Sequence, residues 1–169
     1  MIWAPPLRRL VLLTHVVSSV GFLGAVAVFV VLAVAGISSP DPLKVRAAYL
    51  AGEMITWRLI VPLCFASLLT GLAVSLGTSW GLFRHYWVLI KLLITLFVTL
   101  VLMIHTRPVS EMAQLAAGMS PFTPDLLGAQ IQLVVASGGG VLALLAAATL
   151  SIYKPRGLTR YGWRKQHEK

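Results

Sequence analysis

Residues 85–108 read HYWVLIKLLITLFVTLVLMIHTRP, a run of apolar side chains that is interrupted by Lys91 and ends near His105. About 20 consecutive apolar residues are enough for an α-helix to cross the hydrocarbon core of a bilayer. Three further stretches of this kind lie near residues 10–36, 51–76 and 126–153. The sequence therefore predicts four membrane-spanning helices, the third of them near residues 86–105.

The composition of the chain agrees with this prediction. Of its 169 residues, 58% are hydrophobic and 11% are charged, and the mean hydropathy is +0.87, whereas a soluble domain carries about 25% charged residues. The net charge of +9 does not indicate nucleic acid, because short basic clusters are separated by long uncharged runs instead of forming a basic stripe on a soluble fold. We expect an all-α fold, an integral membrane four-helix bundle in contact with the lipid bilayer.

The distribution of basic residues predicts the orientation. Four spans place both termini on one side, and that side receives Arg8, Arg9, Arg84 and the basic tail of residues 154–169, whereas the other side receives Lys44, Arg46 and Arg107. The positive-inside rule then places both termini in the cytoplasm. We expect a transmembrane domain over residues 1–153. The tail is also rich in aromatic residues, and we expect it to lie on anionic lipid headgroups.

Four ionisable side chains lie within or at the ends of the predicted spans. With a rise of about 1.5 Å per residue, His15 and Lys91 lie about 8 Å from the cytoplasmic end, and Arg58 and His105 lie roughly 27–29 Å from it. Ionisable groups in membrane helices are costly and are candidates for function. Because His15 and His105 are separated by about 20 Å along the membrane normal, we expect that they do not both bind one iron.

Three of these residues also have a purely structural explanation. The long Lys91 side chain can reach the cytoplasmic headgroups, and Arg58 can reach the outer surface in the same way or pair with Glu53. His105 precedes Thr106, Arg107 and Pro108, which is typical of the end of a helix. His15 has a short side chain and needs a partner within the bundle or a ligand, so it is the strongest candidate.

The residues around His15 favour haem over a metal ion alone. The chain has no Cys/His spacing of the zinc type. Thr14, Ser18, Gly21 and Ala25 form a stripe of small side chains, which allows either close helix packing or a groove for a planar cofactor. Imidazoles on neighbouring transmembrane helices, beside small residues, are what a b-type haem needs. A haem here would therefore take one histidine and a different sixth ligand, or each side of the membrane would have its own site. We expect His15 to be the metal ligand; a quinone held by His105 and Arg58 is a second expectation.

Prolines predict two irregularities. Pro62 cannot donate to the carbonyl of Arg58, so we expect a kink in the second span. After Pro108, residues 109–117 are expected to form a separate short interfacial helix that is closed by Gly118 and Pro121.

Two stretches resemble a known group of membrane proteins. Residues 13–29, LTHVVSSVGFLGAVAVF, resemble the first helix of the CopD-like and HemJ-like group of small four-helix bacterial membrane proteins, in which a histidine precedes small residues and an aromatic one. Residues 85–105 resemble its third helix, with an aromatic residue, a lysine and a histidine. The tail KPRGLTRYGWRKQ, residues 154–166, resembles that of uncharacterised actinobacterial members.

The resemblance implies a multi-pass protein of the bacterial inner membrane. It also implies binding of haem b through His15, with Lys91 as a functional basic residue, and electron transfer or haem-linked oxidation as the chemistry. The alternative is a non-enzymatic membrane protein, either a transporter subunit or a partner-binding scaffold, acting as a homo-oligomer or in a larger membrane complex. Copper transfer ranks lower, because only Met112 and Met119 are candidate ligands on the outer side.

Overall fold

A computed structural model of the chain describes residues 3–77, 82–118, 124–155 and 157–167. Within these residues the structure is helical and has no strand. The elements are α1 (Pro5–Ser38), α2 (Pro42–Ile55), the π-helical segment η1 (Thr56–Ile60), α3 (Val61–Gly77), α4 (Tyr86–Ala117), the short 3-10 segment η2 (Pro124–Leu126), α5 (Leu127–Tyr153) and α6 (Arg160–His167). The helices Pro5–Ser38, Pro42–Gly77, Tyr86–Ala117 and Leu127–Tyr153 are long and apolar enough to cross a membrane. The predicted all-α four-helix membrane protein is confirmed.

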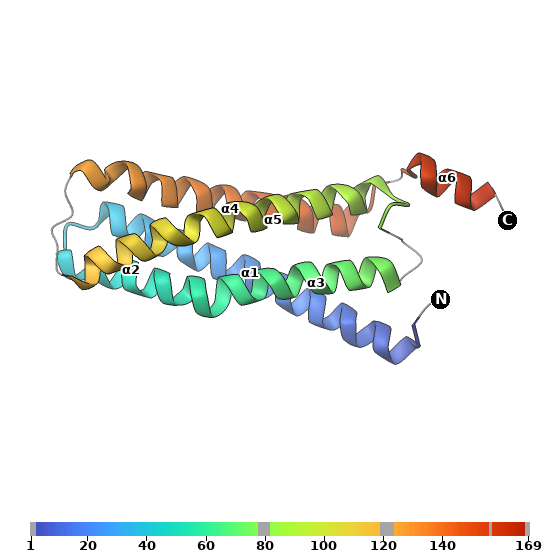
Figure 1. Cartoon of the computed structure of the whole chain (residues 1–169), viewed down its shortest axis with the longest axis horizontal. Helices are drawn as coiled ribbons and strands as arrows, with labels where there is room; N and C mark the ends of the chain where they lie inside the picture. The colour runs from blue at the N-terminus through green and yellow to red at the C-terminus, as the bar shows by residue number, and fades with distance from the viewer. Residues whose placement is uncertain (1–2, 78–81, 119–123, 156, 168–169) are drawn as a thin grey trace.

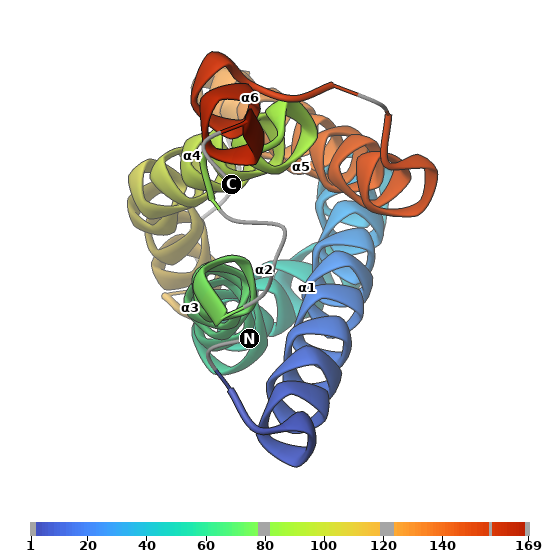
Figure 2. The same ribbon diagram turned by 90° about the vertical axis from the view of Figure 1, so that its right-hand side faces the viewer.

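The four long helices run side by side, and both chain termini lie at the same end of the bundle (Figure 1). We call this end the terminal end and the opposite end the distal end. Helix α1 packs against α2, α3 and α5, and α4 packs against α2 and α5. Seen from the terminal end, α1 lies between α3 and α5, and α4 lies next to α5 (Figure 2).

Three of the four long helices extend further at the distal end than we expected. The second helix begins at Pro42 instead of near residue 51, and the Asp41 carboxylate caps it by accepting a hydrogen bond of 3.0 Å from the Leu43 N–H. With lengths of 32–36 residues, α1, the α2–α3 helix and α4 each measure roughly 48–54 Å. Since the hydrocarbon core is about 30 Å thick, these helices extend beyond it.

The separate interfacial helix that we expected after Pro108 does not form. Instead, α4 continues through Pro108 to Ala117 and is followed by Gly118 as expected, whereas Pro121 lies outside the described residues. A proline inside a helix removes one backbone hydrogen bond. The residues beyond it offset this loss, because Val109, Met112, Ala113 and Ala116 are buried where α4 packs against α2.

The irregularity predicted at Pro62 takes the form of a π-helical segment. In η1 the helix is widened, and the Val61 N–H bonds to the Thr56 carbonyl five residues back. The proline ring would clash with the carbonyl four residues before it in a regular α-helix. A widened turn just before Pro62 relieves this clash, and such segments often occur at functional sites.

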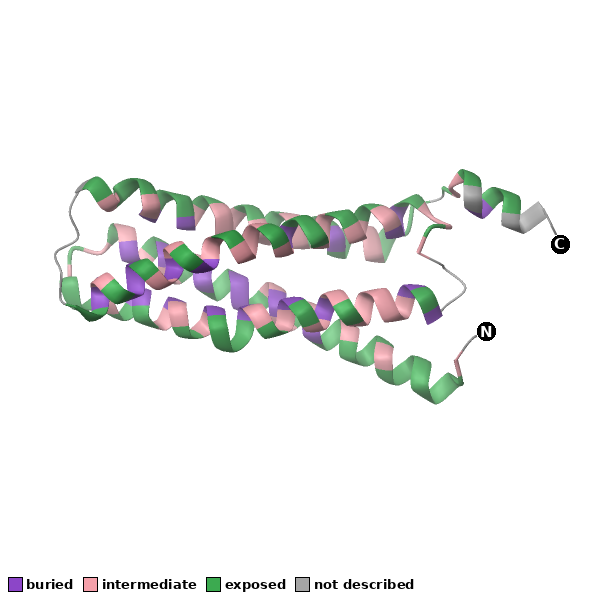
Figure 3. Ribbon diagram, in the orientation of Figure 1, coloured by how far each residue is buried: buried purple, intermediate pink, exposed green. Residues whose placement is uncertain are grey.

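Packing differs between the two halves of the bundle. The buried apolar cluster lies mostly in the distal half, which we define as residues 22–60 and 98–140; its largest members are Phe22, Phe29, Tyr49, Ile60 and Met112. The terminal half comprises residues 5–21, 61–77, 86–97 and 141–153. Few of its residues are buried, as Figure 3 shows by the scarcity of buried segments toward the termini. The distal half therefore holds most of the core.

The tail folds back onto the start of α4. The Thr159 N–H donates to the Arg84 carbonyl at 3.0 Å, and the Tyr86 N–H approaches the Gly157 carbonyl at 3.4 Å. The Thr159 hydroxyl donates to the Phe83 carbonyl and accepts a hydrogen bond of 3.0 Å from the Gly162 N–H, which makes Thr159 the N-cap of α6. The expected tail thus contains a docked helix; its residues 156, 168 and 169 lie outside the described part.

Candidate functional site

His15 lies on α1 in the terminal half and faces α3. Its Nδ1 is 3.1 Å from the Ser67 carbonyl and 3.2 Å from the Thr70 hydroxyl. A Cβ atom added to Gly71 would come within 2.9 Å of the imidazole, so the absence of a side chain at Gly71 lets the ring lie against α3. The next turn of α1 continues the contact, because the hydroxyls of Ser19 and Ser67 are 2.7 Å apart.

These contacts assign the tautomer of His15. A carbonyl oxygen only accepts hydrogen bonds, so Nδ1 must carry the proton that reaches Ser67. The Thr70 hydroxyl already donates to the Ala66 carbonyl and can accept from the same Nδ1–H. This leaves the lone pair on Nε2, for which the described part of the chain supplies no hydrogen bond. The imidazole is therefore held through one nitrogen and open at the other.

Lys91, on α4, lies at the same end of the bundle as His15. Its ammonium nitrogen is 5.6 Å from the centre of the Trp87 ring, a cation–π distance. The Lys91 charge also acts electrostatically on His15. His15 and Lys91 thus both lie in the terminal half, as their equal depth predicted, but no hydrogen bond joins them.

His105, on α4 in the distal half, has both ring nitrogens engaged. Nδ1 lies 2.7 Å from the Val101 carbonyl, one turn back on the same helix, so it carries the proton. Nε2 then accepts from the Gln132 amide nitrogen on α5 at 3.3 Å. An imidazole with no open nitrogen is a poor metal ligand, and His105 instead ties α4 to α5.

Arg58 does not join His105. It lies in η1 with its side chain exposed, and it forms no ion pair with Glu53 or with any other described residue. Gln130, on α5, is buried beside Tyr49. Arg58 and His105, which the sequence placed at the same depth, therefore do not form one polar cluster.

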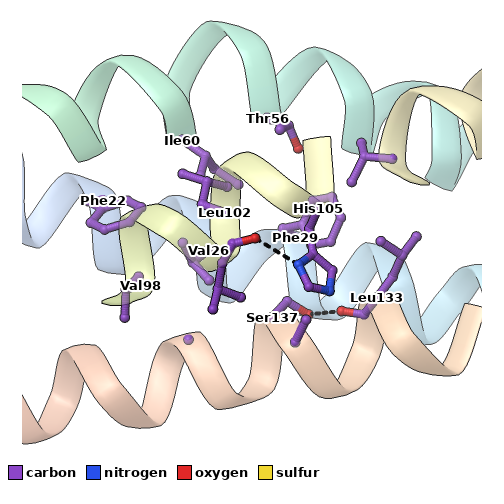
Figure 4. A pocket seen from close by; sticks show the side chains of 14 residues that line it. Phe22, Val26, Phe29, Thr56, Ile60, Val98, Leu102, His105, Leu133 and Ser137 are labelled. Atoms are coloured by element: carbon purple, nitrogen blue, oxygen red, sulfur yellow. Dashed lines mark hydrogen bonds between the residues drawn. The ribbon is translucent and has the colours of Figure 1, made fainter. Parts of the chain in front are cut away.

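An apolar cavity lies between the four long helices in the distal half (Figure 4). The volume of this cavity is about 60 Å³. Its main apolar walls are Phe22, Phe29, Ile60, Leu102, Val109 and Leu133. Three polar side chains, Thr56, His105 and Ser137, also line it. We did not foresee this cavity from the sequence, because it is formed by residues of four helices that are far apart in the chain.

The α3 residues that hold His15 were also not foreseen. Ser67, Thr70 and Gly71 are small or weakly polar residues in an apolar run, and they lie more than 50 positions from His15 in sequence. The spacing of Ser67, Thr70 and Gly71, at three and four residues, does place them on one helix face. Such a face of small and weakly polar residues could have indicated that α3 contacts a histidine on another helix.

Other metal sites find no support in the described residues. They contain no group of three or more His, Cys, Asp and Glu side chains that could hold a metal ion. Of the two methionines considered for copper, Met112 is 3% exposed and Met119 lies outside the described residues. No family model matches the chain, and neither the curated proteins nor the solved structures include a match.

Proposed function

We propose that this membrane protein binds haem b through His15 and acts in electron transfer or haem-linked oxidation at the bacterial inner membrane, with both termini in the cytoplasm. One observation carries the proposal. His15 is anchored through its Nδ1–H to the Ser67 carbonyl and leaves Nε2 without a partner in the described chain. Metal-ligating histidines are typically held in this way, because a hydrogen bond from the second nitrogen fixes the tautomer and orientation of the ring.

The neighbouring residues suit such a ligand. Lys91 supplies a positive charge near His15, which would stabilise a carboxylate such as a haem propionate. Ser18 and Gly21 keep the adjoining face of α1 narrow. The bound haem would supply one-electron chemistry, and the chain's own residues would orient the ring, tune the basicity of His15 through Ser67 and exclude bulk water.

Absorption spectroscopy with added haemin tests the proposal. The purified wild-type protein is expected to show a Soret band that saturates at one haem per chain, and the His15→Ala variant is expected to lose it. His105→Ala is the matched control, because it removes an imidazole whose two nitrogens are both engaged, and it should keep the band. A folded wild-type protein that stays colourless with haemin would overturn the proposal.

A partner-binding scaffold is the second candidate function. It is favoured by α5, whose most apolar stretch contains few buried residues, and where a Cβ added to Gly138 or Gly139 would meet no neighbouring atom within 4 Å. Surfaces with such small residues allow close helix–helix packing in membranes. Co-purification of the colourless protein with a larger membrane complex, or as a homo-oligomer, would favour this function over haem chemistry.

The tail supports a membrane-surface role for the terminal end. Helix α6 carries Arg160 and Arg164, and Trp163 is 58% exposed. Basic and aromatic side chains on a docked surface helix suit the anionic headgroups of the cytoplasmic leaflet. The tail is therefore proposed to bind anionic lipid, and amide exchange of α6 should depend on the charge of the lipid.

A further inference from the structure

Two oxygen atoms of α3 face the Nδ1 atom of His15. The Ser67 carbonyl oxygen is 3.1 Å from Nδ1, and the Thr70 hydroxyl oxygen is 3.2 Å from it. The Ser67 oxygen belongs to the backbone and is present whatever side chain stands at that position. The Thr70 oxygen belongs to a side chain, so Thr70 is the part of this contact that the sequence can vary.

The proton of the Thr70 hydroxyl is already used within α3. The hydroxyl donates to the Ala66 carbonyl at 2.5 Å, and the Ser67 carbonyl oxygen lies 3.3 Å from the same hydroxyl. Threonine hydroxyls in helices commonly bond a carbonyl three or four residues back. A hydroxyl whose proton is committed can still accept a hydrogen bond through its lone pairs. Thr70 therefore acts toward His15 as an acceptor.

Two acceptors on α3 disfavour the opposite tautomer of His15. With the proton on Nε2, the Nδ1 lone pair would face the oxygens of Ser67 and Thr70 with no hydrogen between them. Turning the Thr70 hydroxyl toward Nδ1 would break its bond to Ala66 and still leave the Ser67 oxygen facing a lone pair. Acceptors that face each other without a donor cost free energy. A proton on Nδ1 satisfies both oxygens at once.

The next residue, Gly71, leaves room beside the other ring nitrogen. A Cβ at this position would lie 2.9 Å from Cε1 and 3.6 Å from Nε2 of His15. A side chain here would therefore stand next to the nitrogen that carries the lone pair. Two adjacent residues of α3 thus have different tasks, because Thr70 holds one nitrogen of the ring and Gly71 leaves space beside the other.

We infer that Thr70 is a positioning residue, which together with the Ser67 carbonyl holds His15 in the Nδ1–H tautomer and presents the Nε2 lone pair to a ligand. Histidines that bind metals are commonly oriented by an acceptor at their second nitrogen. The role of Thr70 in haem binding rests on the function proposed above. The tautomer of His15 can be measured without haem, so the two roles can be tested separately.

Thr14, the neighbour of His15 in the chain, provides a matched control. Its hydroxyl donates to the Leu10 carbonyl four residues back at 3.0 Å, just as the Thr70 hydroxyl donates to Ala66. Thr14 is exposed, and within the described chain no hydrogen bond joins it to the imidazole. Replacement by valine removes a hydroxyl and nearly keeps the shape of the side chain at both positions, but at Thr70 it also removes an acceptor of His15.

The experiment is nitrogen NMR of haem-free protein with isotopically labelled histidine, in nanodiscs at about pH 8, where an ordinary histidine is neutral. The His15 signals are assigned by their loss in His15→Ala, and wild type is expected to show a protonated Nδ1 and an unprotonated Nε2. Thr70→Val should lower the ratio of the Nδ1–H to the Nε2–H tautomer about threefold, the change that a membrane hydrogen bond of about 0.6 kcal/mol produces. Thr70→Ser should restore the ratio, and Thr14→Val should leave it unchanged. Thr70→Ala serves as a second variant if Thr70→Val does not fold.

Three outcomes would overturn the inference. These are a wild-type His15 that carries its proton on Nε2, equal tautomer ratios in wild type and Thr70→Val, and an equal change in Thr14→Val. Haemin titration tests the role toward haem separately, and Thr70→Val is expected to weaken binding by up to about threefold. A protein that stays colourless but shows the expected tautomers overturns the haem proposal and leaves Thr70 as the residue that orients His15.

Discussion

The distal and terminal halves of the bundle are built from the same four helices but are held together differently. In the distal half, large apolar side chains such as Phe22, Phe29 and Met112 form the buried cluster. In the terminal half, α1 and α3 meet through hydrogen bonds of His15, Ser19 and Ser67. Close packing thus dominates one half, and polar contacts dominate the other.

This difference indicates in which half of the bundle a ligand can bind with a small loss of stability. In lipid, helices associate through packing and hydrogen bonds, and a hydrogen bond between them is worth about 0.6 kcal/mol on average. A half that is held by such contacts can rearrange around a ligand without large losses. The distal half, which holds most of the buried core, fixes the mutual positions of the helices.

The largest expected effect comes from crowding the distal half. A Cβ added to Gly36 would lie 2.7 Å from Cζ of Tyr49 and 2.8 Å from its hydroxyl, and Tyr49 is 5% exposed. A buried ring cannot swing away without disturbing its neighbours. Gly36→Ala is therefore expected to lower the free energy of unfolding by about 1–3 kcal/mol, measured by unfolding in mixed detergent–SDS micelles.

Gly24→Ala is the matched control on the same helix. Gly24 is exposed, and a Cβ added to it would meet no neighbouring atom within 4 Å, so the added methyl should leave stability unchanged or raise it by up to about 1 kcal/mol through helix propensity. If Gly36→Ala and Gly24→Ala behave alike, the distal half is not the closely packed half.

The same substitution in the terminal half is expected to have a smaller effect on stability. In Gly71→Ala the new methyl would press on the His15 ring at 2.9 Å. The displaced ring gives up a hydrogen bond worth about 0.6 kcal/mol, and helix propensity offsets the loss by up to about 1 kcal/mol. We expect nearly unchanged unfolding but weaker haemin binding, measured by titration. A destabilisation equal to that of Gly36→Ala would contradict the contrast between the halves.

The sequence predicted the four helices because long apolar runs have few alternatives in lipid. It missed where the second and third helices meet at the distal end. The apolar faces that hold them there, with Val45 and Tyr49 on α2 and Val109 and Met112 on α4, lie in segments too polar to read as spans. Helix ends that extend beyond the bilayer are set by packing against each other and not by hydropathy.

The candidate site was predicted in part for a similar reason. Depth along a helix follows from residue number. The sequence could therefore predict that His15 and His105 lie at different depths and that His15 and Lys91 lie at the same depth. The direction in which each side chain points depends on the partner helix. The engagement of His105 by Gln132 and the exposure of Arg58 therefore needed the structure.

The smallest expected effect is a difference between the two ends of the bundle in their response to the surface charge of the membrane. At the terminal end, α6 carries Arg160 and Arg164 and is capped by Thr159. At the distal end, the basic residues are balanced by acidic residues of similar number: Lys44, Arg46 and Arg107 against Asp41, Glu53, Glu111 and Asp125. Replacing zwitterionic by anionic lipid in nanodiscs should slow amide exchange of residues 160–164, because each basic residue near the surface gains about 1 kcal/mol of binding free energy.

Amides of residues 42–50 provide the internal control and should not change. Equal slowing at both ends would show that lipid charge acts on the whole protein and not on the tail, and high salt should abolish a true surface effect because it screens the attraction.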